Sequence, residues 1–419
     1  MRSASVKILH TSDWHLGKSL GGFSRHQEQQ AVLEEICDIA DAEKVHAVVI
    51  AGDLFDAFNP PAESVDLFYK TLKRLSAGGK RAVIAIAGNH DSPDRIEAPD
   101  PLARECGIIF AGYPNTLVHP FSLDTGLEVT KSEPGFLEIK LPGMFIPLRV
   151  VITPYANELR IKKQLGLENT EEQLRDALEQ TWQEQGNNHL DSNGVNILVS
   201  HLLFMNDGDE LPEEPEDEKP ILHLGGAQAI FTSNLPAPLQ YVALGHLHRM
   251  QAVDRGQSKV FYSGSPLAYS FSEASQDKYV LVANLQPGEN AEISQIKLKK
   301  GRRLVRKRFD DVDKAIQWLV DHPTELVEVT LATDNYLTGQ ERRRLSQAHK
   351  GIISIIPEVK NAAVPGQEHT RTINPTDNIE TLFSAYFRDR FAGQEPGEGI
   401  LNLFREVLST DKEDDTSKT

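Results

Sequence analysis

Polar residues of the kinds that bind metal ions recur at five places in the first 250 residues. In chain order these clusters are Asp13-x-His15, Gly52-Asp53-x-x-Asp56, Gly88-Asn89-His90-Asp91, Ser200-His201 and Gly245-His246-x-His248. Carboxylate, imidazole and amide ligands together suit borderline divalent ions such as Mn²⁺, Fe²⁺ or Zn²⁺. A carboxylate can bridge two such ions about 4 Å apart, and the pair stabilises both the attacking and the leaving oxygen of a phosphoryl displacement. The clusters therefore predict a two-metal phosphoryl-transfer site, with Asp53 as the natural bridge.

Each cluster follows a short apolar run that predicts a strand. These runs are Val6–His10, Ala47–Ala51, Arg81–Ala87, Val195–Ser200 and Tyr241–Leu244. Helical periodicity over residues 25–42 and from Pro61 to Leu75 separates the first three, so the first hundred residues alternate β and α. Ligands of open α/β sheets bind at the carboxyl ends of strands, which is where the clusters lie. We therefore expect residues more than two hundred positions apart to converge, with glycines 52, 88 and 245 allowing sharp turns close to the ions.

The rest of the chain is less regular. Further strands are predicted at 149–153, 260–263 and 278–283, a helix at 171–185 and an acidic, solvated loop at 207–218. A basic run, residues 297–308, is either an edge strand protected by its charges or a surface that follows the DNA phosphate backbone. After it, helices at 312–320 and 340–348 and strands at 326–333 and 352–356 predict a compact second module. A helical hairpin follows Pro375, and its apolar face packs either on its own domain or on a partner.

Composition limits the class of protein. Forty-four Lys and Arg against 61 Asp and Glu give a formal net charge of -17, which argues against unspecific coating of nucleic acid. The sequence shows neither a secretory signal nor a long apolar run, so no membrane span is expected. Two isolated cysteines, Cys37 and Cys106, fit a reducing compartment. A cytoplasmic protein is the resulting expectation.

The complete series D-x-H, G-D-x-x-D, G-N-H-D, H and G-H-x-H resembles the signature of the calcineurin-like metallophosphoesterases. The longer segments 11–17 (TSDWHLG), 52–56 (GDLFD) and 88–92 (GNHDS) are similar to the DNA-repair nuclease branch, in bacteria the SbcD family of nuclease subunits. Archaeal members of that branch have histidine where Asp56 stands. The resemblance implies an α/β fold, a two-sheet β-sandwich flanked by helices with a small α+β capping domain and a C-terminal helical hairpin. The expected domains are 1–285 (nuclease), 286–365 (capping, DNA-binding), 370–410 (ATPase-binding helices) and a disordered tail, 411–419.

The resemblance also implies roles for individual residues. One ion would be held by Asp13, His15, Asp53 and His248, and the other by Asp53, Asn89, His201 and His246. His90 would be the catalytic acid, and Asp56 or Asp91 would orient a neighbouring imidazole. Lys18 and Arg25 are candidate DNA phosphate contacts, with plain surface charge as the alternative.

The activity implied is that of a Mn²⁺-dependent DNA nuclease of repair, replication and recombination. It would be a 3′ to 5′ double-strand exonuclease and a single-strand and hairpin endonuclease. Its partners would be DNA, a coiled-coil ATPase of the SbcC type and a second copy of itself within a heterotetramer. Two alternatives remain open from the residues alone: a metallophosphoesterase for nucleotides or cyclic phosphodiesters, and a catalytically silent scaffold that bridges DNA ends.

Overall fold

The computed structural model describes residues 5–155, 171–206, 209, 230–253, 259–333, 337–359 and 379–390, with 396–398, 400, 401 and 404 as isolated positions. The chain forms two compact units, residues 1–358 and 359–419. The predicted acidic loop, apart from Asp209, and the predicted disordered tail lie outside the described residues.

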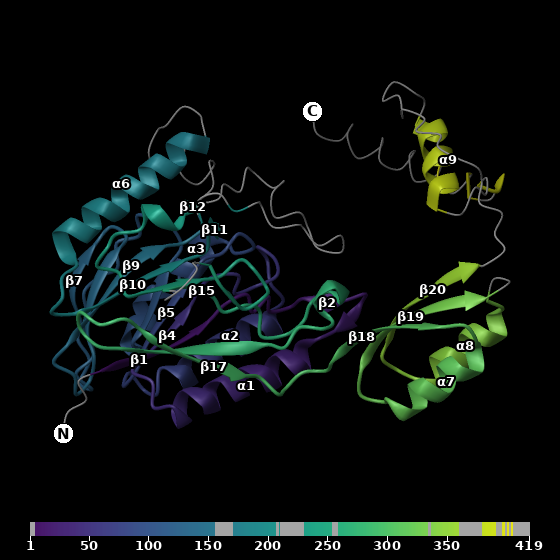
Figure 1. Cartoon of the computed structure of the whole chain (residues 1–419), viewed down its shortest axis with the longest axis horizontal. Helices are drawn as coiled ribbons and strands as arrows, with labels where there is room; N and C mark the ends of the chain where they lie inside the picture. The colour runs from purple at the N-terminus through teal and green to yellow at the C-terminus, as the bar shows by residue number, and fades with distance from the viewer. Residues whose placement is uncertain are drawn as a thin grey trace. The chain divides into compact units, whose positions relative to one another are not determined.

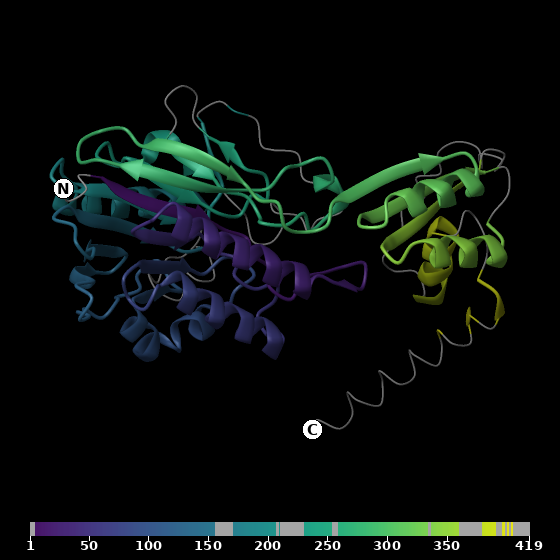
Figure 2. The same ribbon diagram turned by 90° about the horizontal axis from the view of Figure 1, so that it is seen from below.

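A six-stranded sheet carries the first three clusters. Its order is β17 (Glu292–Lys297), β16 (Tyr279–Leu285), β1 (Val6–Thr11), β4 (Ala47–Ile50), β5 (Ala82–Ile86) and β6 (Ile108–Ala111). Strands β1, β4, β5 and β6 are parallel, whereas β16 pairs antiparallel with β1 and places Val6 opposite Leu285. Figure 2 shows purple β1 beside green β16 and β17, although they are far apart in sequence. The sheet continues to Lys297, beyond the domain boundary expected at residue 285.

A seven-stranded sheet carries the last two clusters. Its order is β14 (Gln251–Ala252), β15 (Val260–Tyr262), β13 (Tyr241–Leu244), β10 (Val195–Ser200), β9 (Pro147–Thr153), β8 (Phe136–Lys140) and β7 (Glu128–Glu133). The central strands β9, β10, β13 and β15 are parallel. The ligand-bearing ends of β10 and β13 therefore lie at one edge of this sheet.

The two sheets pack face to face on a buried apolar cluster that includes Ile8, Ile84 and Val150. Helices α1 (His26–Ala42) and α2 (Ala62–Leu75) bury the outer face of the first sheet. Helix α6 (Glu171–His189) covers the outer face of the second through Leu178 and Trp182 (Figure 1). Short elements complete this part: β2 (Ser19–Leu20), β3 (Phe23–Ser24), α3 (Pro93–Glu97), α4 (Asp100–Ala103), β11 (Phe204–Met205) and β12 (Ile230–Phe231). The predicted two-sheet sandwich flanked by helices is confirmed.

A small α+β module follows within the first unit. Its three-stranded sheet has the order β18 (Leu304–Phe309), β19 (Leu326–Thr333) and β20 (Ile352–Val359), with helices α7 (Val312–Asp321) and α8 (Gly339–Ala348). Its core joins strand residues such as Val329 to helix residues such as Leu319 and Leu345. The basic run does form an edge strand, β18, and its two arginines are paired: Arg306 Nε lies 2.8 Å from Glu328 and Arg308 Nε 2.7 Å from Glu358.

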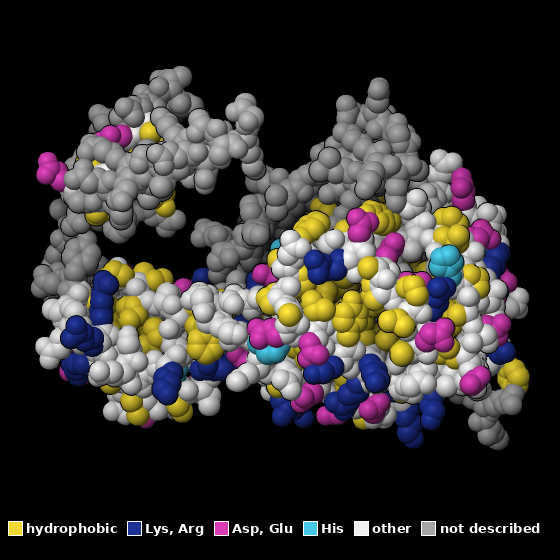
Figure 3. All heavy atoms as spheres, turned by 180° about the vertical axis from the view of Figure 1, so that it is seen from behind, with side chains coloured by type: hydrophobic (Ala, Val, Ile, Leu, Met, Phe, Trp, Pro, Cys, Tyr) yellow, Lys and Arg dark blue, Asp and Glu magenta, His cyan; other side chains and the backbone are white. Residues whose placement is uncertain are grey.

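Acidic and basic side chains are mixed on the surface. On the face shown in Figure 3, Lys and Arg side chains are interspersed with Asp and Glu over the two-sheet part of the molecule. This face therefore presents mixed charge, despite the strongly acidic total.

The second unit contains helix α9 (Ile379–Arg390). The Phe383 ring stacks on that of Phe404, with centroids 4.0 Å apart and an interplanar angle of 11°. Most of the second helix of the predicted hairpin falls outside the described residues. Among the helices that are described, none combines the length and hydropathy needed to cross a membrane.

Candidate metal centre

The loops after β1 and β4 are joined by backbone hydrogen bonds. Asp13 N donates to Gly52 O (3.0 Å), and His15 N donates to Asp53 O (3.0 Å). Four of the six non-glycine residues with positive φ in the described part of the chain belong to the predicted clusters: Asp13 (53°), His15 (43°), Asp53 (50°) and His246 (99°). Such backbone conformations are costly for L-residues and gather at functional sites.

Glycine is required where these loops touch. A Cβ on Gly88 would lie 2.1 Å from Asp53 Oδ1, and one on Gly245 would lie 1.9 Å from Ala51 O. No side chain fits at these distances, so glycine allows the loops of the two sheets to approach one another at the site.

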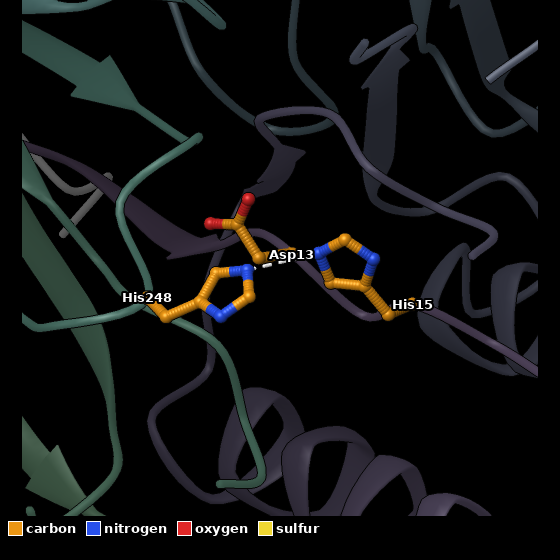
Figure 4. Close-up of side chains that lie close together, drawn as sticks. All are labelled: Asp13, His15 and His248. Carbon is orange, nitrogen blue, oxygen red and sulfur yellow. Dashed lines mark hydrogen bonds between the residues drawn. The ribbon is translucent and has the colours of Figure 1, made fainter. Parts of the chain in front are cut away.

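Asp13, His15 and His248 form one group, in which one potential ligand atom from each lies within 4.8 Å of the others. Figure 4 shows the imidazoles of His15 and His248 directed at each other beside the Asp13 carboxylate, and their Nε2 atoms are 3.0 Å apart. The three side chains are brought together from two sheets, because Asp13 and His15 follow β1 whereas His248 follows β13. Strand β13 is also held at this end by a hydrogen bond from His246 N to Asp13 Oδ1 (2.9 Å).

Asn89, His201 and His246 form the other half. Asn89 Oδ1 lies 2.9 Å from His201 Nε2 and 3.1 Å from His246 Nδ1. His201 Nδ1 donates to Ala51 O at 2.7 Å, so its Nε2 carries the lone pair and faces the site.

Asp53 lies between the two halves. Its Oδ2 is 3.5 Å from His15 Nε2 and 3.4 Å from His201 Nε2. This is the position that a bridging carboxylate needs, so the structure brings together all seven predicted ligands.

The residues present fit divalent cations. Two carboxylates, Asp13 and Asp53, are buried close together, and His246 Nε2 is buried without a hydrogen-bond partner among the described residues. Clustered buried anions and an unpartnered imidazole nitrogen are unfavourable unless a cation compensates them. The mixed oxygen and nitrogen donors suit the borderline ions expected from the sequence.

Burial and the two carboxylates set the protonation states. Burial lowers the pKa values of His15 and His246 to about 3, which keeps both imidazoles neutral, as metal ligands must be. Burial also disfavours the charged form of His201, but the negative charges of Asp53 and Asp13 outweigh it and raise the pKa of His201 to about 9. Burial alone would raise the pKa of Asp53, yet the neighbouring His201 charge brings it well below its usual range.

The predicted acid, His90, lies at the rim of the centre. Its backbone N donates to Asp53 Oδ1 (2.9 Å), and its Nδ1 is 2.9 Å from Asp56 O. A carbonyl oxygen only accepts, so Nδ1 carries a proton and Nε2 remains for a substrate. The His90 ring is also 4.9 Å from that of His15, centroid to centroid.

The two predicted supporting carboxylates differ in role. Asp56 Oδ1 is 3.5 Å from His15 Nδ1, which places it to orient that imidazole, and 3.3 Å from Lys18 Nζ. Asp91 is fully buried and accepts hydrogen bonds from the backbone amides of Leu54 (3.0 Å), Phe55 (3.0 Å) and Gly88 (2.8 Å). Asp91 thus ties the loop after β4 to the loop after β5. Burial and the Asp53 charge raise the pKa of Asp91 to about 6.

The two predicted phosphate contacts have different outcomes. Lys18 is beside Asp56 with 24% of its side chain exposed, so it remains able to reach a phosphate at the site. For Arg25 the expectation is wrong. Its residue is 1% exposed, and its guanidinium donates to Glu28 (2.8 and 3.0 Å) and to Ala268 O (2.8 Å). Because these contacts bury the charge, Arg25 is a structural residue.

Two residues near the centre were not predicted. Glu273, in a 3₁₀ turn at Phe271–Glu273, has Oε1 3.4 Å from His248 Nδ1 and pairs with Lys278. A capping-box pattern, Ser270-x-x-Glu273, was the available sequence signal for it. His10 is fully buried between the sheets and contacts Tyr241 and Leu244 of β13. A lone histidine at a strand end gives no comparable signal.

Comparison with known proteins identifies the family. The calcineurin-like phosphoesterase family model matches residues 6–250. The SbcD subunit of the nuclease SbcCD from Bacillus subtilis is 36% identical over 98% of this chain and 100% of its own length. The SbcD subunits of the same nuclease from Rhodobacter capsulatus (34% identity, 68% of this chain, 67% of theirs) and Escherichia coli K12 (28%, 81% and 81%) are also similar. The predicted membership is confirmed: the chain belongs to the calcineurin-like phosphoesterases, a family of metal-dependent hydrolases, and within them to the SbcD family of nuclease subunits.

Proposed function

We propose that this chain is the nuclease subunit of an SbcCD-type complex and hydrolyses DNA phosphodiesters with two divalent ions, Mn²⁺ being the favoured pair. The observation that carries the proposal is the meeting of the seven predicted ligands, from five chain segments and both sheets, around Asp53. The names of its relatives add the substrate and the ATPase partner.

In this proposal Asp13, His15, Asp53 and His248 hold one ion, and Asp53, Asn89, His201 and His246 hold the other. When bound, the ions supply the positive charge that makes a water nucleophilic near neutral pH and stabilises the phosphorus centre. The water oxygen forms the new P–O bond, and the bond from phosphorus to the departing sugar oxygen breaks. His90 protonates that oxygen through Nε2, since its Nδ1 is committed to Asp56 O.

The proposed substrate range is that of an enzyme for DNA ends: 3′ to 5′ exonuclease on duplexes, and endonuclease on single strands and hairpins. The small module from 286 to 365 would guide duplex DNA, and the helices from 370 to 410 would bind an SbcC-type ATPase. Two copies of each protein would form a cytoplasmic heterotetramer for repair, replication and recombination. Because β18 arginines are already paired with glutamates, Lys18 is the better-placed phosphate contact near the centre.

The test is digestion of linear, end-labelled duplex DNA with Mn²⁺, with Mg²⁺ and with chelator, beside His90→Ala. We expect Mn²⁺-dependent degradation that His90→Ala reduces by at least about 100-fold with folding unchanged. A cyclic nucleotide in parallel tubes is the discriminating control. Turnover of the cyclic nucleotide without DNA cleavage would instead identify a small-molecule phosphodiesterase.

The docking assignment needs a separate experiment. Removing residues 375–419 should abolish co-purification with an SbcC-type ATPase while leaving Mn²⁺-dependent hydrolysis of a small phosphodiester unchanged. Normal ATPase binding by the truncated chain would refute the assignment.

A further inference from the structure

We propose that His10 and Tyr241 form a polar bridge through the core between the two sheets, and that this bridge sets the separation of the two halves of the metal centre. His10 is then a positioning residue, because it touches no ligand of the ions and acts through the strands that carry them. The inference rests on the proposed metal centre and assigns a residue outside it.

The bridge directly joins the two strands that lead into the site. His10 lies on β1, three residues before Asp13, and Leu244 lies at the end of β13, two residues before His246. His10 Nδ1 is 2.8 Å from Tyr241 Oη, and Nε2 is 3.1 Å from Leu244 O.

These contacts fix the tautomer. Because a carbonyl oxygen only accepts, Nε2 carries the proton and donates to Leu244 O, while Nδ1 accepts from the Tyr241 hydroxyl. His10 and Tyr241 are both fully buried, and their rings meet edge to face at 5.8 Å. The bridge therefore uses every polar atom of the two side chains in one geometry.

No backbone ladder joins β1 to β13. Strand β1 pairs with β16 and β4, and β13 pairs with β10 and β15. The sheets meet through the apolar cluster, whose attraction is non-directional and tolerates small sliding movements. Hydrogen bonds are directional, so the bridge defines the offset of one sheet on the other.

That offset is also the geometry of the site. Asp13 and His15 move with β1, whereas His246 and His248 move with β13. Two other polar links cross between the sheets at the site itself: His246 N to Asp13 Oδ1 (2.9 Å) and Ser12 Oγ to Ser263 Oγ (2.7 Å). The His10 bridge lies below them in the dry core, where it supports a ligand array whose atoms must meet within a few tenths of an ångström.

Stability alone gives little reason for a polar pair at this place. A neutral hydrogen-bonded pair in a core contributes little net stability, and replacing both partners with apolar groups of the same shape can be neutral. Directional positioning is what the apolar replacement would lose.

The test is the double variant His10→Phe with Tyr241→Phe, which removes the bridge and keeps the core filled. Mn²⁺ affinity is measured by calorimetry on the full chain, and thermal unfolding is followed separately in chelator. We expect melting in chelator to change by no more than a few degrees and the Mn²⁺ Kd to weaken roughly tenfold or more, the range known for residues that orient metal ligands.

Two further variants sharpen the result. In His10→Gln the side-chain amide can donate to Leu244 O and accept from Tyr241, so we expect affinity close to wild type. Ile8→Val trims the same strand in the same core without touching a polar link, and it should leave the Mn²⁺ Kd unchanged. Tyr241→Phe alone removes a single hydroxyl, and it takes over the test if the double variant does not fold.

The outcomes separate this inference from the proposed function. A wild-type chain that binds no Mn²⁺ overturns the metal centre itself. Wild-type binding with an unchanged Kd in the bridge variants overturns the positioning role and leaves the proposed function standing.

Discussion

Replacing Glu273 with Gln should both destabilise the protein and weaken its metal site. The Glu273 side chain is 3% exposed and that of its partner Lys278 is 9% exposed, so the pair is buried. Removing one charge of a buried pair costs about 3 to 5 kcal/mol, because the other charge stays buried without compensation. For a domain of this size that corresponds to a melting temperature lower by about 6 to 20 °C.

The second effect passes through His248. Glu273 Oε1 lies 3.4 Å from His248 Nδ1, so the carboxylate helps to orient the imidazole whose Nε2 faces the centre. Losing such a partner typically weakens metal affinity about 10- to 100-fold. The double variant Glu273→Gln with Lys278→Met removes the orphaned charge. It should recover most of the stability and none of the affinity.

The assays are thermal unfolding by circular dichroism in chelator and Mn²⁺ titration calorimetry. Burial raises the pKa of Glu273, but Lys278 and His248 outweigh it and hold the pKa below its ordinary value of 4.5. The carboxylate therefore contributes stability above pH 4.5 that is lost as the pH falls through its lower folded-state pKa. The gap between wild type and Glu273→Gln should accordingly narrow below pH 4.5. A variant that melts within 2 °C of wild type at pH 7.5, or binds Mn²⁺ equally well, would refute this reasoning.

Three other outcomes follow from the geometry. Gly88→Ala should cost about 1 to 3 kcal/mol of stability and weaken Mn²⁺ binding in calorimetry, because its Cβ would lie 2.1 Å from Asp53 Oδ1; normal binding would contradict this. Lys18→Ala should reduce the slope of log DNA affinity against log salt by about one with unchanged melting, whereas Arg25→Ala, with its guanidinium buried, should lower the melting temperature and leave the slope alone. Burial raises the pKa of Cys37 to about 12, so this thiol should not react with Ellman's reagent at pH 8 until the protein is unfolded; prompt reaction in a variant lacking the other cysteine would show that it is accessible.

Much of the fold was predictable because buried strands of a parallel sheet are continuous apolar runs. Strands Val195–Ser200, Tyr241–Leu244 and Leu326–Thr333 have the predicted bounds. Strands β7 and β8 were missed, because their text is rich in charge and a register shift between Val129 and Lys131 interrupts the alternation. Strand β17 was also missed, since it is an edge strand with four of its six residues exposed.

The site was predictable as a set of residue types and much less as a set of contacts. The ligands could be named because several short motifs recur in a fixed order, each after a strand. Burial was invisible, so Arg25 looked like surface charge at a helix start, although Glu28 one helical turn later was a hint of pairing. The supporting role of Glu273 depends on the distance between a turn and a histidine 25 residues earlier, which no local pattern encodes.

The antiparallel pairing of β1 with β16 has a consequence for how the protein comes into being on the ribosome. Val6 is opposite Leu285, so the first strand waits for its neighbour until most of the chain has been made. At about 5 to 20 residues per second, that delay is roughly a quarter of a minute to a minute. Asp13 leaves the ribosome long before His248 and before the strand that completes its sheet. A nascent chain thus carries its metal-binding residues for many seconds without an assembled centre, and hydrolytic competence should appear only after synthesis has passed residue 285.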